Sequence, residues 1–114
     1  MLPCQWLAVE CISERSFSAK SDVWAFAVLC WELLAYGQTP YENTPTKDVP
    51  DLVRTGVRLD PAPNTPPEHS NVYTEIYDLQ LQCWLPHPAD RPSFATVKNT
   101  LLRIASSIKV VEMQ

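Results

Sequence analysis

Residues 22–36 read DVWAFAVLCWELLAY, and this stretch decides the fold. Its apolar side chains fall on every side of a helix, so we expect the helix to be surrounded by other parts of the protein. Ser21 or Asp22 is expected to cap its N-terminus, and Gly37 is expected to end it. The stretch is interrupted by Glu32 and is shorter than the roughly 20 apolar residues that span a bilayer. It therefore predicts a buried central helix.

The rest of the chain predicts further helices and no strand. Apolar residues recur at helical spacing on both sides of the central stretch, and prolines and glycines separate these segments. The expected helices cover residues 10–15, 46–55, 72–84 and 93–110, with extended, proline-rich chain at 57–68. The buried stripe of the last helix is expected to contain Phe94, Val97, Leu101, Ile104, Ala105 and Ile108. The fold class is therefore all-α, with four or five helices.

Composition argues against several classes of function. The chain has 114 residues, a net charge of −4 and no cluster of Lys and Arg, so we expect no nucleic-acid partner. Its cysteines form no closely spaced pair, and only two histidines accompany them, so we expect no zinc site. Reduced, buried thiols are expected, although the cysteine count leaves disulfides open. Its first residues lack the charged and apolar regions of a signal peptide, so we expect a cytoplasmic location and no membrane span in this chain.

Several short motifs resemble those of protein tyrosine kinases and occur in the same order. They are Leu-Pro-x-x-Trp (2–6), Ala-Val-Glu (8–10), Ser-Asp-Val-Trp-Ala-Phe (21–26), Trp-Glu-Leu (31–33), Gly-x-x-Pro-Tyr (37–41), Cys-Trp (83–84) and Asp-Arg-Pro-Ser-Phe (90–94). The resemblance identifies residues 1–110 as part of a tyrosine kinase domain, running from the end of the activation segment to the last helix. Residues 111–114 would be a tail. The expected structure is a partial C-lobe without the N-lobe sheet. Within the tyrosine kinases, the motif sequences are similar to those of the Axl, Mer and Met receptor groups.

The resemblance implies structural roles for four residues. Glu10 and Arg91 would form a largely buried ion pair, in which the guanidinium holds the carboxylate with two parallel hydrogen bonds. The alternative is two unrelated surface charges. Asp22 and Trp24 would anchor the central helix, with Asp22 directed toward the catalytic loop. Because these 114 residues do not contain that loop, capping of the helix is the alternative role for Asp22.

The resemblance also implies a substrate loop at the start of the chain. Leu2 and Pro3 would support the substrate tyrosine, and Trp6 would pack beneath them. The alternative is a frayed N-terminus. The chain's own tyrosines are expected to pack rather than to accept phosphate; they are Tyr36, Tyr41, Tyr73 and Tyr77. Protein substrates or other kinase segments are the expected partners. The alternative to a wholly cytoplasmic protein is the cytoplasmic portion of a plasma-membrane receptor.

The sequence lacks the signatures of the nucleotide site. Phosphoryl transfer in kinases uses a Gly-rich loop, a strand lysine, His-Arg-Asp and Asp-Phe-Gly, and none occurs here. ATP and Mg²⁺ are implied for the complete domain, but we assign no catalytic, cofactor or metal residue to this chain. Three hypotheses remain: a catalytically incompetent piece of a receptor-type tyrosine kinase, a non-catalytic binding module or decoy, and an unrelated helical adaptor.

One segment departs from the family pattern. His69–Glu75 is about seven residues more than the resemblance implies. It is a loop insertion, an additional helical turn or an artefact of the gene model.

Overall fold

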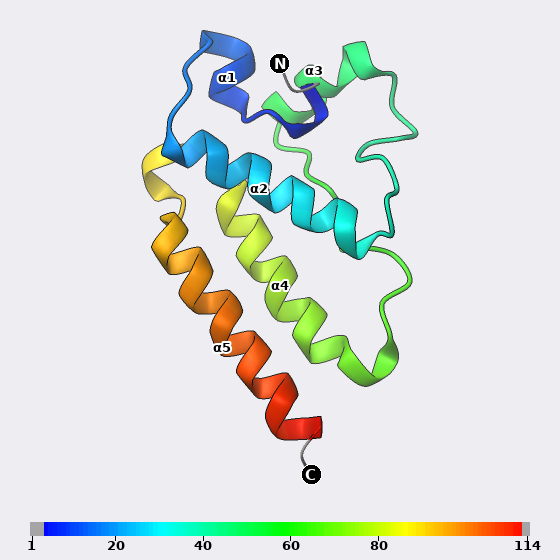
Figure 1. Cartoon of the computed structure of the whole chain (residues 1–114). Coiled ribbons are helices and arrows are strands. Elements are labelled where there is room, and N and C mark those ends of the chain that lie inside the picture. The colour runs from blue at the N-terminus through cyan, green and yellow to red at the C-terminus, as the bar shows by residue number, and fades with distance from the viewer. Residues whose placement is uncertain (1–3, 113–114) are drawn as a thin grey trace.

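The computed structural model describes residues 4–112, and the side chains of residues 4–108. Over this range every regular element is helical, which confirms the all-α prediction (Figure 1). The longer helices are α1 (Val9–Glu14), α2 (Ala19–Leu34), α3 (Val49–Arg54), α4 (Ser70–Cys83) and α5 (Phe94–Glu112). Short 3-10 helices accompany them: η1 (Cys4–Trp6), η2 (Thr46–Asp48), η3 (Pro67–His69) and η4 (Pro88–Asp90).

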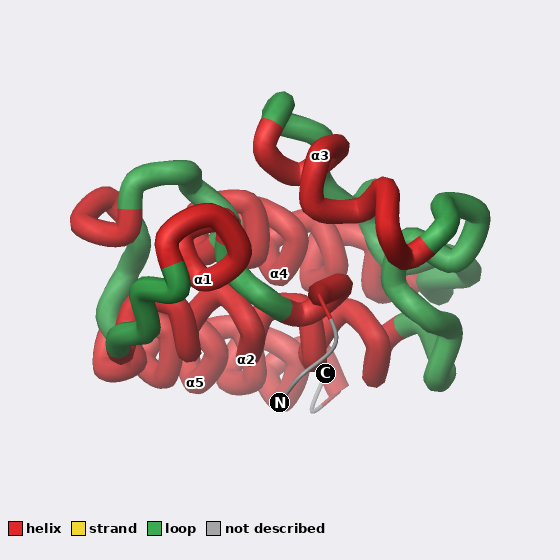
Figure 2. Tube along the Cα trace, turned by 90° about the horizontal axis from the view of Figure 1, so that it is seen from above, coloured by secondary structure: helices red, strands yellow, loops and turns green. Residues whose placement is uncertain are grey.

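Helix α2 lies across the middle of the molecule. Below it in Figure 1, α4 and α5 run side by side in opposite directions, and α4 contacts α2. Helices α1 and α3 lie on the opposite side of α2 from α4 and α5. In Figure 2, which is seen from above, they are therefore nearer to the viewer than α2. The apolar side chains that α2 buries form the centre of the core; they are Val23, Trp24, Ala27, Val28 and Trp31. The expected central helix is therefore α2, but it is not surrounded on every side, because Leu29 and Leu33 on one of its faces are exposed.

The start of α2 is fixed by two serines that bond to each other. Ser21 N–H donates to Ser18 Oγ at 3.3 Å, and Ser18 N–H donates to Ser21 Oγ at 2.7 Å. This reciprocal capping box satisfies two backbone donors at the end of the helix. The prediction that Ser21 or Asp22 caps the helix is wrong, because Ser18 holds the extended capping position and Asp22 already lies in the first turn.

The end of α2 has an aromatic residue in a conformation that favours glycine. Tyr36 has φ +55° and Gly37 has φ +86°. Gly37 N–H donates to Glu32 O at 2.9 Å and Tyr36 N–H donates to Leu33 O at 3.2 Å, the two bonds of a Schellman motif. Tyr36, rather than Gly37, is thus the first left-handed residue. Its side chain is 79% exposed, so the expectation that Tyr36 packs is also wrong.

The other tyrosines contact the protein interior. Tyr41 and Tyr77 pack against the core, and Tyr77 Oη donates to Leu59 O at 2.8 Å. Burial raises the pKa of Tyr41 to about 12, despite the opposing effect of the Arg58 charge. Tyr73 is half-buried.

The last helix is buried along a narrower stripe than predicted. Val97 and Ile104 are buried, and Leu101 and Ile108 are half-buried. Phe94 and Ala105 are exposed, contrary to the expectation, because they line an open groove on a side of α5 that no described element covers.

The remaining segments follow the sequence pattern with small shifts. Residues 70–75 of the unexpected segment form the first turns of α4, and His69 ends η3. All four cysteines are free thiols, of which Cys11 and Cys83 are buried. Within residues 4–112, no helix is long and apolar enough to cross a membrane.

Replacing Tyr36 with glycine should stabilise the protein. A non-glycine residue in the left-handed region costs about 1–2 kcal/mol, while the additional freedom of glycine in the unfolded chain offsets about 0.4–1 kcal/mol. Urea denaturation should therefore show Tyr36→Gly to be more stable by roughly 0.5–1 kcal/mol. Leu33→Gly is the control, since Leu33 is 69% exposed but helical, and it should lose about 1 kcal/mol. Destabilisation by both changes would contradict the assignment of strain.

Candidate functional site

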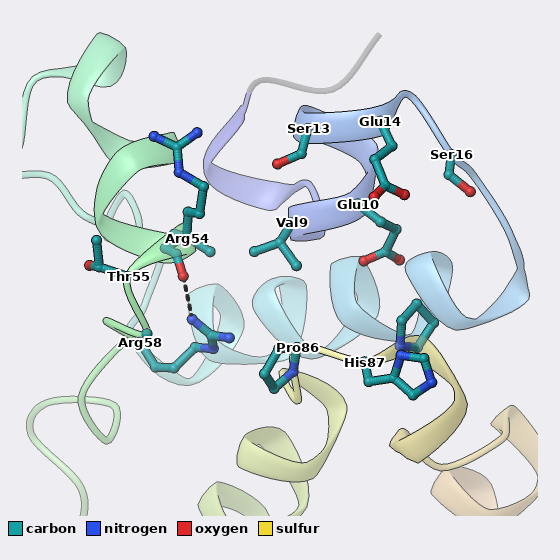
Figure 3. Close-up of a pocket in the computed structure, with 13 residues that line it drawn as sticks. Val9, Glu10, Ser13, Glu14, Ser16, Arg54, Thr55, Arg58, Pro86 and His87 are labelled. Carbon is teal, nitrogen blue, oxygen red and sulfur yellow. Dashed lines mark hydrogen bonds between the residues drawn. The ribbon is translucent and has the colours of Figure 1, made fainter.

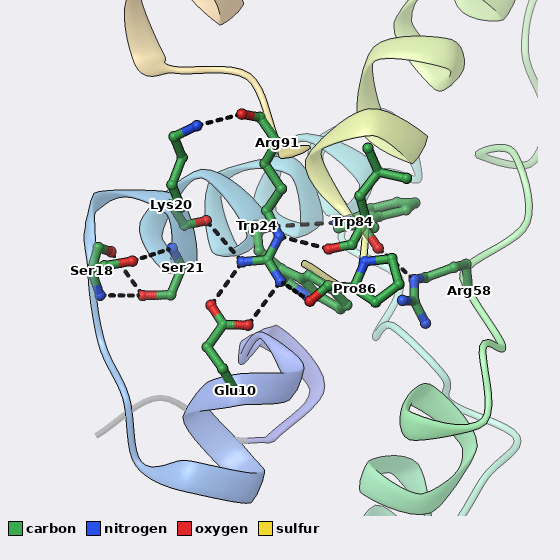
Figure 4. A network of polar contacts seen from close by, with 10 residues as sticks. Glu10, Ser18, Lys20, Ser21, Trp24, Arg58, Trp84, Pro86 and Arg91 are labelled. Carbon is green, nitrogen blue, oxygen red and sulfur yellow. Dashed lines mark hydrogen bonds and ion pairs between the residues drawn. The ribbon is translucent and has the colours of Figure 1, made fainter. Parts of the chain in front are cut away.

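The most connected polar side chain in the described part of the protein is Arg91. Arg91 Nη1 donates to Glu10 Oε2 at 2.7 Å, and Nη2 donates to Glu10 Oε1 at 2.8 Å (Figure 4). Backbone carbonyls accept the remaining N–H groups: Leu85 O at 2.7 Å, Lys20 O at 3.2 Å and Pro86 O at 3.3 Å. The five N–H groups of a guanidinium thus all have acceptors. The Arg91 side chain is fully buried and that of Glu10 is 9% exposed.

Trp24 of α2 supports two guanidinium groups. The Cζ atom of Arg91 lies 4.9 Å from the centroid of the Trp24 ring, and that of Arg58 lies 4.8 Å from it. A cation over an indole face is stabilised by the ring quadrupole, by about 2 kcal/mol when desolvated. Trp84 continues this arrangement, because its Nε1 donates to Trp24 O at 3.3 Å and its carbonyl accepts from Arg58 Nε at 2.8 Å.

The start of α2 belongs to the same network. Lys20 donates through Nζ to Arg91 O, while its own carbonyl accepts from Arg91 Nη1. The capping box of Ser18 and Ser21 fixes the first turn in which Lys20 lies (Figure 4). The hydrogen bonds of Arg91 therefore connect helix α1 and the first turn of α2 to the segment that follows η4.

The ion pair shifts the acidity of Glu10. Burial by itself raises the pKa of this carboxyl, but the hydrogen bond from Arg91, a backbone hydrogen bond and the positive charge of Arg91 outweigh it. The net result is a pKa below the ordinary value of 4.5. Glu10 is therefore held in its charged form.

A pocket of about 680 Å³ opens beside this network. Figure 3 shows α1 on one side of it, with Glu10, Ser13 and Glu14, and α3 with the chain after it on the other, with Arg54, Thr55 and Arg58. Pro86, His87 and Pro88 close a third side. The described residues contain no group of three or more His, Cys, Asp and Glu placed to hold a metal ion.

The structure places the expected site residues in three different situations. Glu10, Arg91 and Trp24 come together in one network. Trp6 in η1 is half-buried against the core. Asp22 is exposed in the first turn of α2 and does not cap it. The two expected residues of the substrate loop, Leu2 and Pro3, lie outside the described residues.

Sequence reasoning missed Arg58 and Lys20. Both act largely through backbone carbonyls, which every residue carries and which leave no signal in a sequence. The one available signal for Arg58 is an isolated basic residue between Val57 and Leu59, at the start of the proline-rich segment.

The amino-acid sequence is similar to a family model and to several known proteins. The family model described as "Protein tyrosine and serine/threonine kinase" matches residues 1–101. The epidermal growth factor receptor of Drosophila melanogaster is 44% identical over 104 residues, which are 91% of this chain and 7% of the receptor. Protein sevenless of Drosophila virilis is 41% identical over 113 residues, 99% of this chain and 4% of that protein.

The similarity extends to other receptors, always over a small share of their length. The fibroblast growth factor receptor of Strongylocentrotus purpuratus is 38% identical over 105 residues, 92% of this chain and 10% of the receptor. The chain thus spans a tenth or less of the length of these three relatives. They do not test the expected likeness to the Axl, Mer and Met groups, which stays a prediction.

Acid should weaken the fold through Glu10. Because the folded-state pKa of Glu10 is lowered, its contribution to stability is complete above the ordinary value of 4.5 and is lost as the pH falls through the folded-state pKa. Urea denaturation at pH 7 should show Glu10→Gln to be less stable by about 3–5 kcal/mol, because Arg91 loses its buried counter-charge. The gap should narrow as the pH is lowered below 4.5.

Glu75→Gln is the matched control, since Glu75 is exposed and lies 3.7 Å from Arg103. This change should lower the free energy of unfolding by less than about 1 kcal/mol at neutral pH. The variant should lose stability in acid to the same extent as the original protein. The account would be contradicted if the difference in free energy of unfolding between Glu10→Gln and the original protein stayed the same from pH 7 to pH 3.

Proposed function

This chain belongs to the protein tyrosine and serine/threonine kinase family, and from that premise we propose that residues 1–110 form the C-terminal part of a receptor-type tyrosine kinase domain. The observation that carries the proposal is the buried pair of Glu10 and Arg91. It holds the segment that follows the expected substrate loop against α2 and the start of α5. The complete protein would transfer phosphate from ATP to tyrosine in protein substrates.

The proposed role of the chain's own residues is to hold and orient. We infer that Leu2 and Pro3 support the substrate tyrosine, and that Trp6, which packs against the core, supports them from below. Asp22 would accept hydrogen bonds from the catalytic loop of the complete domain. Two observations support this role: its carboxylate is exposed, and it lies at the positive end of the α2 dipole.

The residues present do not fit a nucleotide and its metal. The 114 residues contain two glycines and no Gly-rich loop, Asp-Phe-Gly or His-Arg-Asp. The described residues offer no cluster of metal-ligating side chains either. We therefore assign no step of phosphoryl transfer to this chain and propose that these residues alone are catalytically incompetent.

A non-catalytic binding module is the second candidate, and one observation favours it. Helices α2 and α5 leave an apolar groove of about 410 Å³ open, in which the rings of Phe26 and Phe94 meet edge to face at 6.0 Å. Leu29 and Leu33 extend the apolar surface along α2 and are 45% and 69% exposed. In a complete lower lobe, earlier helices would cover this side of α2. A decoy would instead present it to kinase partners.

A chimeric receptor tests the proposed function. Residues 1–101 replace the matching segment of the Drosophila melanogaster epidermal growth factor receptor, and phosphate transfer is measured on two peptides that differ only in carrying tyrosine or serine. We expect transfer to tyrosine alone and none from the 114-residue chain with ATP and Mg²⁺. Glu10→Gln in the chimera should reduce the rate, whereas Glu75→Gln, at an exposed side chain within the transplanted segment, should not. A folded chimera that is inactive, or that prefers serine, would contradict the proposal.

The open apolar face should make the isolated chain associate with itself. Exposed apolar patches of several hundred Å² promote association. Leu29→Glu combined with Leu33→Glu should lower the apparent mass in sedimentation and the fluorescence of a bound apolar dye. Phe17→Glu is the control, because Phe17 is 61% exposed but lies before α2. A monomeric original protein, or an equal effect of the control, would show that this face does not drive association.

A further inference from the structure

We propose that the pocket between α1, α3 and the segment around η4 binds a peptide segment through a carboxylate side chain, with Arg58 as its counter-charge. The proposal does not depend on whether the complete protein is an active kinase.

Arg58 is fixed in place without using its whole hydrogen-bonding capacity. Its Nε donates to Trp84 O at 2.8 Å, and its Nη1 donates to Val53 O at 2.8 Å and to Val57 O at 3.0 Å. The guanidinium also lies over the Trp24 ring. Nη2 has no acceptor among the residues whose side chains the structure describes. A rigid guanidinium with one free edge is pre-organised to bind an oxygen anion, because little side-chain entropy remains to be lost.

The positive charge of Arg58 is not neutralised nearby. Among the described side chains, no carboxylate lies within 4.0 Å of it, whereas Arg91 is paired with Glu10 and Arg54 with Asp51. Half-buried charges are costly unless an opposite charge accompanies them. Burial lowers the pKa of Arg58, and the nearby charge of Arg91 acts in the same direction, while Tyr41 opposes both. An anion in the pocket would relieve this repulsion.

The opposite wall of the pocket selects among anions. Figure 3 places Glu14 across the pocket from Arg58, and Glu14 forms no ion pair with a described side chain. Glu10 on that wall is already paired with Arg91, so the free carboxylate of Glu14 is the charge that would repel a ligand with several phosphates. A ligand with one carboxylate placed at Arg58 and one basic group placed near Glu14 has charges complementary to both walls. Val9 and Pro86 add apolar surface between them.

The volume of about 680 Å³ is that of a typical ligand pocket and exceeds what one small anion fills. Hydroxyl groups from Ser13, Ser16 and Thr55 line it and can bond to peptide groups. A short extended peptide that carries an acidic and a basic residue therefore fits the pocket better than a free ion does.

The test uses the complete 114-residue chain and defined peptides. Acetyl-Ala-Glu-Ala-Lys-Ala-amide is titrated into the ¹⁵N-labelled chain, and amide shifts are followed by NMR. We expect saturable shifts around the pocket, at Val9, Thr55, Gly56, Arg58 and His87. The same peptide with Gln in place of Glu should bind about tenfold more weakly, because one charge-assisted hydrogen bond is lost.

Two variants and one control assign the two walls. Arg58→Lys keeps the charge but loses the planar fork, and it should weaken the peptide containing Glu. Glu14→Gln changes an exposed side chain, so it should leave the fold intact and should weaken binding only when the peptide contains Lys. Arg103→Gln, on the remote part of α5, should change nothing.

Several results would overturn the proposal. Equal binding of the Glu and Gln peptides would do so, as would shifts confined to other surfaces. Sodium phosphate that displaces the peptide at equal concentration, with no effect of Glu14→Gln, would reduce the pocket to a simple anion site. Should Arg58→Lys fail to fold, the peptide pair and Glu14→Gln still decide the question.

Discussion

The architecture depends on one buried ion pair. Glu10 and Arg91 stand 81 positions apart in the chain and meet with both carboxylate oxygens on the guanidinium. Removing such charges from water costs several kcal/mol for each ion. The cost is tolerable here because all five N–H groups of Arg91 have acceptors and Trp24 lies beneath the cation. The pair therefore favours one arrangement of α1 relative to the segment between η4 and α5.

The consequences of this pair reach the central helix. Lys20 contacts Arg91 through both its ammonium and its carbonyl, so the first turn of α2 cannot shift without breaking the network. Trp24, one turn further along, connects Arg91 to Arg58 and thereby to the pocket. The side of α2 that carries Leu29 and Leu33 is free of these contacts and remains open to solvent. The chain is thus firmly organised on one side of its central helix and leaves apolar side chains exposed on the other.

The central helix could be predicted from the sequence because its apolar residues fall on all sides, a pattern typical of a helix that packs in a core. The same pattern wrongly predicted that every side would be covered, since Leu29 and Leu33 are exposed. Three other features depend on tertiary contacts or backbone conformation, which the sequence pattern does not contain. Ser18 and Ser21 are both plausible caps, and only the backbone conformation before the first turn decides for Ser18. Phe94 and Ala105 have the spacing of buried residues, but spacing cannot show whether a neighbour exists to cover them. Arg58 was missed because carbonyl acceptors have no sequence signature.

A double-mutant cycle on Glu10 and Arg91 measures the central interaction most directly. The free energy of unfolding is determined in urea at neutral pH for the original chain, for Glu10→Gln, for Arg91→Gln and for the double variant. The account predicts a coupling energy of about 2 kcal/mol or more, within the range found for side chains in direct contact. Additive effects, with a coupling below about 0.5 kcal/mol, would contradict the claim that this pair holds the fold together.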